Sequence, residues 1–181
     1  MISQELVKEL FSYDHASGEF LCRKARGNLK VGDVAGTVDY QGYVRISISG
    51  RRYRAHRLVW LYVYGIMPDT EIDHINGIKN DNRLSNLRLA TRAQNETNKG
   101  KQRNNKSGYK GVFWDKRNNK WTAQIGMGRK SKYLGLFSTP EEAHAAYCKA
   151  ANEHFGEFAN AGDRKSTRLN SSHGYISYAV F

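Results

Sequence analysis

The chain has 181 residues, which is enough for one domain of ordinary size or for two small ones. Its 29 Lys and Arg against 17 Asp and Glu give a formal charge of +12, which favours an anionic partner, most simply nucleic acid. No apolar run approaches the roughly 18 residues of a membrane helix, and the N-terminus does not have the pattern of a secretory signal, so the composition argues against a membrane or a secreted protein.

The positive charge is concentrated near the middle of the chain. Between Asn82 and Trp114 the single acidic residue is Glu96, whereas the cations are Arg83, Arg88, Arg92, Lys99, Lys101, Arg103, Lys106 and Lys110. A surface that is only solvated normally mixes both signs, so this distribution argues against a protein that is merely basic. Cys22 and Cys148 lack the close spacing of a zinc or redox motif and are expected to be free thiols.

Residues 1–50 are expected to form a small β-rich extension. "SQELVKELF" has a helical pattern, and "YDHASGEFLCRK" contains two short β-like runs about a Ser-Gly turn. The alternation of Val44, Ile46 and Ile48 with polar residues is typical of a half-buried strand, and a hairpin turn comes next at Gly50. This extension could lay a cationic face on DNA, or it could simply support the next part of the chain.

Residues 51–98 carry the residues suited to chemistry. "HRLVWLYVYG" favours a buried helix that ends near Gly65, and "TEIDHI" has strand character. A loop of turn formers, a short strand "LRLA" and a helix come next, and Thr91 with Gln94 forms a capping box at the start of that helix.

This order places a carboxylate, an imidazole and amides where a phosphodiester could be hydrolysed. A hard divalent ion takes oxygen ligands, which Asp73 and the helical Asn95 offer. His74 points to the opposite pleat from Asp73, so it could face a water in solvent and remove its proton. Asn86 could hold the loop or orient His74 through its amide.

Residues 54–98, with "AHRLVW", "DHINGIKNDNRLSNL" and "TRAQN", resemble the HNH nuclease family, in particular the branch found in phage and intron-encoded homing endonucleases. The resemblance implies a ββα-metal fold, with Asp73 and Asn95 as metal ligands, His74 as general base and Asn86 as the central Asn. The last of these positions is often His in the family and is Asn here. His56 belongs to the recurring pattern, but its role does not follow from the sequence.

Residues 99–162 form a second module. "KGKQRNNKSG" is a basic linker without apolar residues, so we place a linker over 99–107. Three strands are expected in "YKGVFWDKRNNKWTAQIGMG" and "RKSKYLGLF", followed by a helix with Thr139 as N-cap, Pro140 at its first position and Glu142 closing a capping box. An alanine-rich apolar stripe would let this helix sit close on the sheet.

This module, residues 108–160, resembles the Apetala-2/ethylene-response-factor type of DNA-binding domain in "YKGV", "KWTAQI", "YLGLF" and "TPEEAHAAYCKAA". The resemblance implies that the sheet enters the major groove, with the face opposite the core toward DNA: Lys110, Phe113, Thr122, Gln124, Ser131 and Tyr133. Phe113, Gly126 and Ser131 stand where the family usually has Arg, so its target preference should not be transferred. Lys116, Arg129 and Lys132 are expected to hold phosphates.

The predicted fold class is therefore α+β: a β-rich extension, a ββα-metal nuclease module, and a three-stranded antiparallel sheet packed by one helix. The predicted function is a site-directed, homing-type DNA endonuclease that uses Mg²⁺ or Mn²⁺ on double-stranded DNA, as a monomer or homodimer in the cytoplasm (of the host, if phage-encoded). The alternative is a non-catalytic DNA-binding regulator that retains the nuclease fold as scaffold. The residues expected to contact DNA are Arg83, Arg92, Lys101, Arg103, Lys110, Lys116, Gln124, Arg129, Lys132 and Tyr133.

The C-terminal tail stands apart from these modules. "DRKSTRLNSSHGYISYAVF", residues 163–181, resembles the in-frame translation of a sequencing-library adapter, with Gly174 and Tyr175 where a variable index would fall. No inference on fold or function is therefore based on this segment.

Overall fold

The computed structural model describes residues 2–102, 104–128 and 130–162, and it divides the chain into two compact units that meet between Asn98 and Lys99. The predicted DNA contacts of Arg103 and Arg129, and the predicted adapter origin of residues 163–181, concern parts of the chain outside the described residues. In the described part, no helix has the length and apolar character needed to cross a bilayer.

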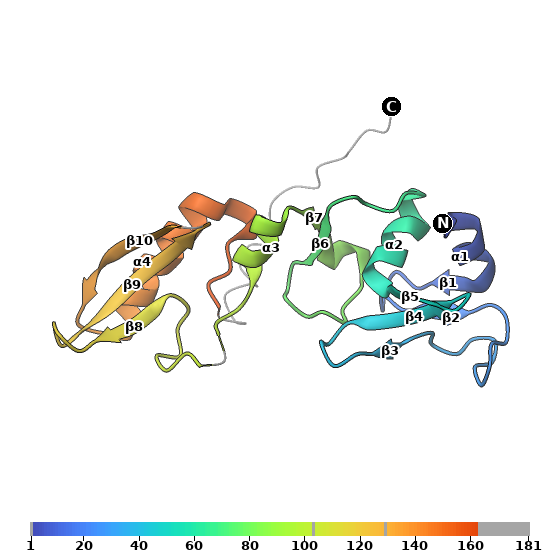
Figure 1. Ribbon diagram of the computed structural model, residues 1–181, viewed down its shortest axis with the longest axis horizontal. Helices are drawn as coiled ribbons and strands as arrows, with labels where there is room; N and C mark the ends of the chain where they lie inside the picture. Colours follow the sequence, from blue (N-terminus) through green and yellow to red (C-terminus); the bar gives the residue numbers. More distant parts are fainter. Residues whose placement is uncertain (1, 103, 129, 163–181) are drawn as a thin grey trace, which may run out of the picture. The chain divides into compact units, whose positions relative to one another are not determined.

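The described part of the first unit contains three helices and three small antiparallel sheets (Figure 1). In chain order its elements are α1 (Gln4–Leu10), β1 (Phe11–Tyr13), β2 (Phe20–Cys22), β3 (Thr37–Val38), β4 (Val44–Ile48), β5 (Arg51–Arg54), α2 (Ala55–Tyr64), β6 (Glu71–His74), a 3₁₀ turn (Leu84–Asn86), β7 (Leu87–Ala90) and α3 (Arg92–Asn98). The strands pair as β1-β2, β3-β4-β5 and β6-β7. The predicted order of strand, long loop, strand and helix is thus present over residues 71–98.

Local sequence signals explain where these helices begin and end. The Ser3 side chain accepts a hydrogen bond from the Leu6 amide at the start of α1, and Gly65 ends α2 in the left-handed conformation at φ +77°. The expected capping box of α3 is formed, because the Gln94 side chain accepts from the Thr91 amide and the Thr91 hydroxyl accepts from the Gln94 amide.

One hydrophobic core joins the N-terminal extension to the rest of the first unit. Phe11 and Phe20 from β1 and β2 pack with Leu58 and Val59 of α2, and the same cluster includes Ile72 of β6. All five side chains are at most 6% exposed. The extension therefore supports the β6–β7 hairpin, which is one of the two roles the sequence left open for it.

The extension also holds the long loop before β7. The Tyr13 hydroxyl donates to the Asn82 carbonyl at 2.9 Å and accepts from the Leu84 amide at 2.9 Å. Gly18 has φ +79°, and a Cβ there would lie 2.3 Å from the Arg83 backbone nitrogen, so the loop rests directly on glycine backbone.

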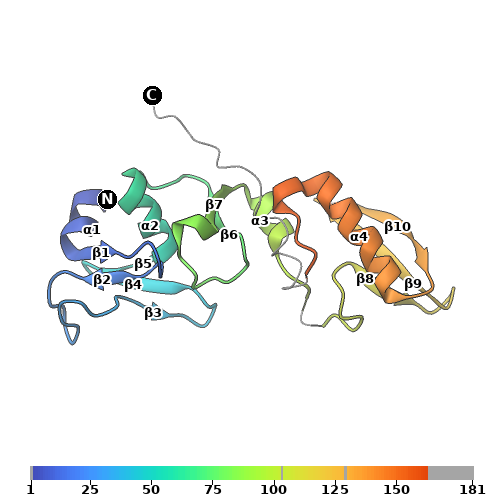
Figure 2. The ribbon, with the colours of Figure 1, turned by 180° about the vertical axis from the view of Figure 1, so that it is seen from behind.

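The second unit, over its described residues, is a three-stranded antiparallel sheet with one helix across one face (Figure 2). Its elements are β8 (Val112–Asp115), β9 (Lys120–Met127), β10 (Lys130–Phe137), α4 (Pro140–Phe155) and a 3₁₀ turn (Gly156–Phe158), and the strand order is β10-β9-β8. The predicted Thr139–Glu142 capping box opens α4. Alanines let this helix lie close on the sheet: Ala143, Ala150 and Ala151 are buried against Ala123, Ile125 and Val112.

The other face of this sheet is not covered by α4. The register pairs Phe113 with Thr122, and Gln124 with Tyr133, on that face. A bulge between Tyr133 and Gly135 lets Leu134 turn into the core, where it packs with the residues under α4. Phe113 and Tyr133 remain 46% and 60% exposed.

Candidate active site

Asp73 lies at the centre of the β6–β7 hairpin and is only 4% exposed. Its register partner across the hairpin is Arg88, whose Nε and Nη2 donate to Asp73 Oδ2 at 2.9 and 2.8 Å. The sequence alone identifies Arg88 only as one of the cations between Asn82 and Trp114 and does not predict its contact with Asp73. Opposite charges on facing positions of an antiparallel pair are the signal that could have identified this contact.

The amide that contacts Asp73 comes from Asn98, the last residue of α3. Asn98 Nδ2 lies 2.9 Å from both Asp73 carboxylate oxygens and 2.9 Å from the His74 carbonyl oxygen, and the side chain is buried. In the described part of the chain no hydrogen bond joins Asp73 to the predicted Asn95. The Asn95 amide instead donates to the Glu71 carboxylate at the partly exposed side of the helix.

His74 points to the opposite side of the strand from Asp73, as the alternation of side chains predicts. It does not point into solvent, however, because its ring is only 5% exposed. The ring meets the ring of His56 edge-on at a centroid distance of 5.1 Å, lies 6.0 Å from the Tyr43 ring, and has Nε2 at 3.3 Å from Asn82 Oδ1. The predicted solvent-facing orientation is therefore replaced by a buried cluster of rings.

Burial keeps both imidazoles of this cluster neutral. Desolvation is the main cause that lowers the pKa of His56 to about 3, and the neighbouring His74, Arg54 and Arg57 lower it further. Desolvation also lowers the pKa of His74, against the opposing effects of the Asn82 hydrogen bond and the Asp73 charge. A neutral imidazole can accept a proton, so the electrostatics of the cluster suit a base at neutral pH.

Asn86 holds the loop rather than the imidazole. Its side chain accepts from the Asn76 amide at 3.0 Å and donates to the Asn76 side chain at 3.0 Å and to the Asp81 carbonyl at 2.8 Å. Of the two roles that the sequence left open, the structure shows the first, and the amide that meets His74 belongs to Asn82. The loop has no periodicity from which this exchange could be predicted.

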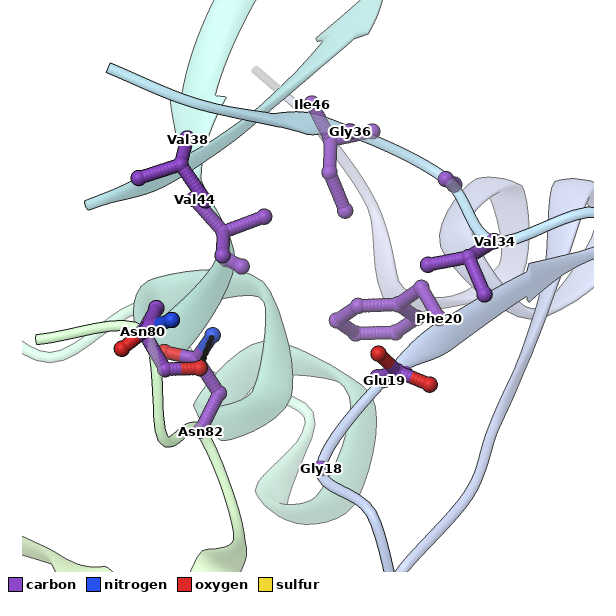
Figure 3. Close-up of a pocket in the computed structure, with 12 residues that line it drawn as sticks. Gly18, Glu19, Phe20, Val34, Gly36, Val38, Val44, Ile46, Asn80 and Asn82 are labelled. Carbon is purple, nitrogen blue, oxygen red and sulfur yellow. Dashed lines mark hydrogen bonds between the residues drawn. The ribbon is translucent and has the colours of Figure 1, made fainter. Parts of the chain in front are cut away.

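A cavity of about 160 Å³ lies beside this loop (Figure 3). Apolar side chains of β2, the following segment and β4 line one side, among them Phe20 and Val44, and the Asn80 and Asn82 side chains line another. Neither Asp73 nor His74 lines it. Asn82, which contacts His74, connects the cavity lining with the site. Within the described ranges, no cluster of three or more His, Cys, Asp or Glu that could hold a metal is present.

The predicted DNA contacts lie in different surroundings. The Arg83 guanidinium pairs with Asp81, and the Lys101 ammonium donates to the Gly108 carbonyl at 2.9 Å. Arg92, Lys116 and Lys132 are exposed, and Gln124 and Tyr133 lie on the uncovered sheet face.

Lys110 does not lie on that face, contrary to the predicted set. Its ammonium donates to the Asn160 carbonyl at 3.1 Å and lies 6.0 Å from the centroid of the Tyr147 ring. Burial lowers the pKa of Lys110 to about 8. The local sequence shows only a lysine between Tyr109 and Gly111, and the segment after α4 encloses it.

Comparisons with known proteins match both halves of the chain. Residues 53–97 match the HNH endonuclease family, and residues 107–157 match the AP2 domain family. "Uncharacterized HNH endonuclease L560" of Acanthamoeba polyphaga mimivirus is 34% identical over 63% of this chain and 59% of its own length, so the chain spans about three fifths of that relative. "Ethylene-responsive transcription factor WRI1" of Arabidopsis thaliana is 49% identical over 30% of this chain and 13% of its own length.

A solved structure described as "DNA binding and cleavage by the HNH homing endonuclease I-HmuI" has 26% sequence identity to this chain. The match covers 49% of this chain and 50% of the chain in that structure, with a TM-score of 0.38. The two family matches coincide with the hairpin–helix that holds Asp73 and with the sheet under α4. The chain therefore combines a domain of the HNH endonuclease family with an AP2 domain.

Proposed function

We propose that this protein is a site-directed DNA endonuclease of the homing type, which cleaves phosphodiester bonds with one divalent metal ion and His74 as general base. The observation that carries the proposal is the pairing of a buried carboxylate with a buried neutral imidazole on adjacent residues of β6, within the match to the HNH endonuclease family. Asp73 and His74 face opposite sides of the strand, so the two groups serve different tasks.

The groups around Asp73 fit a hard divalent cation such as Mg²⁺ or Mn²⁺. Asp73 supplies a carboxylate. The Asn98 side chain supplies a carbonyl oxygen if its amide is rotated by half a turn, so that the oxygen takes the place of Nδ2. Mg²⁺ is commonly held by one or two carboxylates together with waters and substrate phosphates, so a site with one protein carboxylate is sufficient. Asn95 stays the ligand predicted from the family resemblance, and Asn98 is a second candidate because its amide contacts the Asp73 carboxylate.

Such an ion would supply charge neutralisation at the scissile phosphate. Arg88 already pairs with the same carboxylate, so it fixes the orientation of Asp73 and competes with a cation for Oδ2.

His74 is the group that would take the proton from the attacking water. His56 packs against its ring and Asn82 contacts Nε2, so both act as positioning residues. Because the ring is 5% exposed, the water must reach it after DNA has displaced part of the cover, of which the Asn82 contact is the most polar. Asn86 contributes by holding the loop that carries Asn82.

The AP2 domain would select the site. A reader joined to a weakly specific nuclease raises the effective concentration of the nuclease near the chosen sequence without new contacts in the catalytic centre. One HNH centre implies one strand cut per encounter, so a monomer would nick, and a homodimer could cut both strands.

The test is incubation of the full chain with supercoiled plasmid and Mg²⁺. We expect nicked circles with the wild-type protein and with His154→Ala, a control in which an exposed histidine of the second unit is changed. We expect none with EDTA and a loss of about 100-fold or more with His74→Ala. Tight plasmid binding without nicking under Mg²⁺ or Mn²⁺ would instead support a DNA-binding regulator that keeps the HNH fold as scaffold.

A further inference from the structure

The uncovered face of the β8–β10 sheet has a chemistry of its own. Its central positions are Phe113, Thr122 and Leu136 in one row, Gln124 and Tyr133 in the next, and Gly126 with Ser131 in the third. A fourth row on the same face, at the β8–β9 turn, pairs Asp115 with Lys120. The three central rows of the described sheet contain no arginine or lysine. Two aromatic rings, Phe113 at 46% and Tyr133 at 60% exposure, lie on the face with an amide, a hydroxyl and a glycine between or beside them.

The charged residues near this face indicate the kind of ligand that it suits. Exposed cations lie at one end of the rows: Lys116, Arg117 and Lys120 at the β8–β9 turn. Lys130 and Lys132 pair with Met127 and Ile125, so their side chains point to the side of the sheet that carries α4. The single acid of the described sheet strands, Asp115, caps that turn through the Arg117 and Asn118 amides. The helix on the opposite face carries Glu141, Glu142 and Glu153 against one lysine. A group of cations beside rows of uncharged side chains is complementary to phosphates that flank a groove.

The side chains in the three rows suit some base pairs better than others. Guanine is read most often by Arg or Lys, and the three rows provide neither. Glutamine pairs with the N6 and N7 edge of adenine, and apolar groups such as Phe contact the 5-methyl group of thymine. Both partners lie on the major-groove edge of an A·T pair, which is wide enough to admit β-strands.

We propose that the β8–β10 sheet reads thymine and adenine in the major groove of duplex DNA, with Phe113 on a thymine methyl group and Gln124 on an adenine. The inference rests on the proposed site-directed function and adds the class of site that it selects. Lys116 and Arg117 hold phosphates and do not specify sequence. With the rings on base-pair edges, duplex DNA should bind more tightly than the corresponding single strand.

The first experiment is selection of duplexes by the full chain from a randomised pool in EDTA, where cleavage is prevented. We expect enrichment of A·T pairs at adjacent positions. Enrichment of G·C pairs, tighter binding of the corresponding single strand, or no binding to any duplex would overturn the proposal.

The second experiment replaces each thymine of the selected duplex by deoxyuridine, which lacks only the methyl group. Fluorescence anisotropy should show roughly fourfold weaker binding per contacted methyl group, the ratio that corresponds to about 0.8 kcal/mol. In Phe113→Ala the ratio of thymine to uracil affinity should fall to one. The matched control Lys116→Ala should weaken both duplexes equally and keep the ratio.

A third variant keeps the proposal testable if Phe113→Ala is poorly folded. Gln124→Arg should raise affinity for a duplex with one A·T pair replaced by G·C, relative to the selected duplex, by about tenfold. A thymine-to-uracil ratio of one in the wild type, or an unchanged ratio in Phe113→Ala, would contradict the inference. Plasmid nicking is measured separately: its absence with the ratio retained would refute the endonuclease and leave the base preference standing.

Discussion

Replacing Asn98 by alanine should damage the site far more than the same change at Asn95. Both residues lie in the seven-residue helix α3, three positions apart, and both carry the same amide. Asn98 is 6% exposed and contacts the Asp73 carboxylate and the His74 carbonyl, whereas Asn95 contacts the carboxylate of Glu71 on a more open surface. The pair is thus a matched comparison of one side chain in two environments.

The magnitudes follow from those environments. A hydrogen bond to a charged group contributes about 1.5–3 kcal/mol, and loss of Asn98 also leaves the His74 carbonyl with one donor fewer, so we expect a cost of about 2–3 kcal/mol. The Asn95 contact is solvent-screened, and its loss should cost about 0.5 kcal/mol.

Hydrogen exchange measured by mass spectrometry is the suitable assay, because the two units need not unfold together. In Asn98→Ala the β6–β7 peptides should exchange about 30- to 150-fold faster than in the wild type, while peptides from β9 stay unchanged. In Asn95→Ala the change should be about threefold or less. Equal effects of the two substitutions, or a larger effect at Asn95, would refute the assignment of Asn98 to the site.

Three further outcomes are expected. The folded pKa of His56, about 3, lies below the unfolded value of 6.5, so its contribution to stability should be full above pH 6.5 and fall as the pH drops toward 3, by about 2 kcal/mol near pH 5. In urea titrations His56→Phe should lack this part of the acid-dependent loss and keep the part that is due to His74. Gly18→Ala should destabilise the first unit by at least about 1 kcal/mol and slow nicking, because the new Cβ would meet the Arg83 backbone, and unchanged thermal unfolding would contradict this contact. Lys116→Ala should reduce the slope of log affinity for DNA against log salt concentration by about one, whereas Lys110→Ala should leave that slope unchanged and lower only stability. Equal slopes in the two variants would contradict a phosphate contact of Lys116 and an enclosed Lys110.

The helices and strands could be predicted well because their signals are local. Thr91 with Gln94 and Thr139 with Glu142 mark the starts of their helices by cap chemistry alone, and both boxes form as expected. Gly65 ends its helix for the same kind of local reason.

The contacts between elements could not be predicted in the same way. Asn95 and Asn98 lie on the same side of α3, so the helical period does not decide which one contacts Asp73 and which one contacts Glu71 on β6. That choice depends on how the helix is rotated against the hairpin. Likewise, Asn82 rather than Asn86 meets His74 because Tyr13 and Gly18, far earlier in the chain, fix the loop from outside.

The second unit contains one placement that the local sequence predicts and one that a distant contact decides. Phe113 and Gln124 lie on one face, as the family resemblance implied, because the pleat of the strands decides it. Lys110 precedes the strand, so pleating does not govern it, and its direction is set by the carbonyl of Asn160 fifty residues later.

The most direct test of the Asp73 site is the single-turnover rate of strand cleavage by wild-type protein and by Asp73→Asn, each saturated with the same duplex and Mg²⁺. Asparagine keeps the size of the side chain but removes the charge that would hold the cation. The rate should fall by at least about 100-fold while the affinity for DNA in EDTA changes little. Equal cleavage rates in the two proteins would show that the buried carboxylate is not part of the catalytic centre.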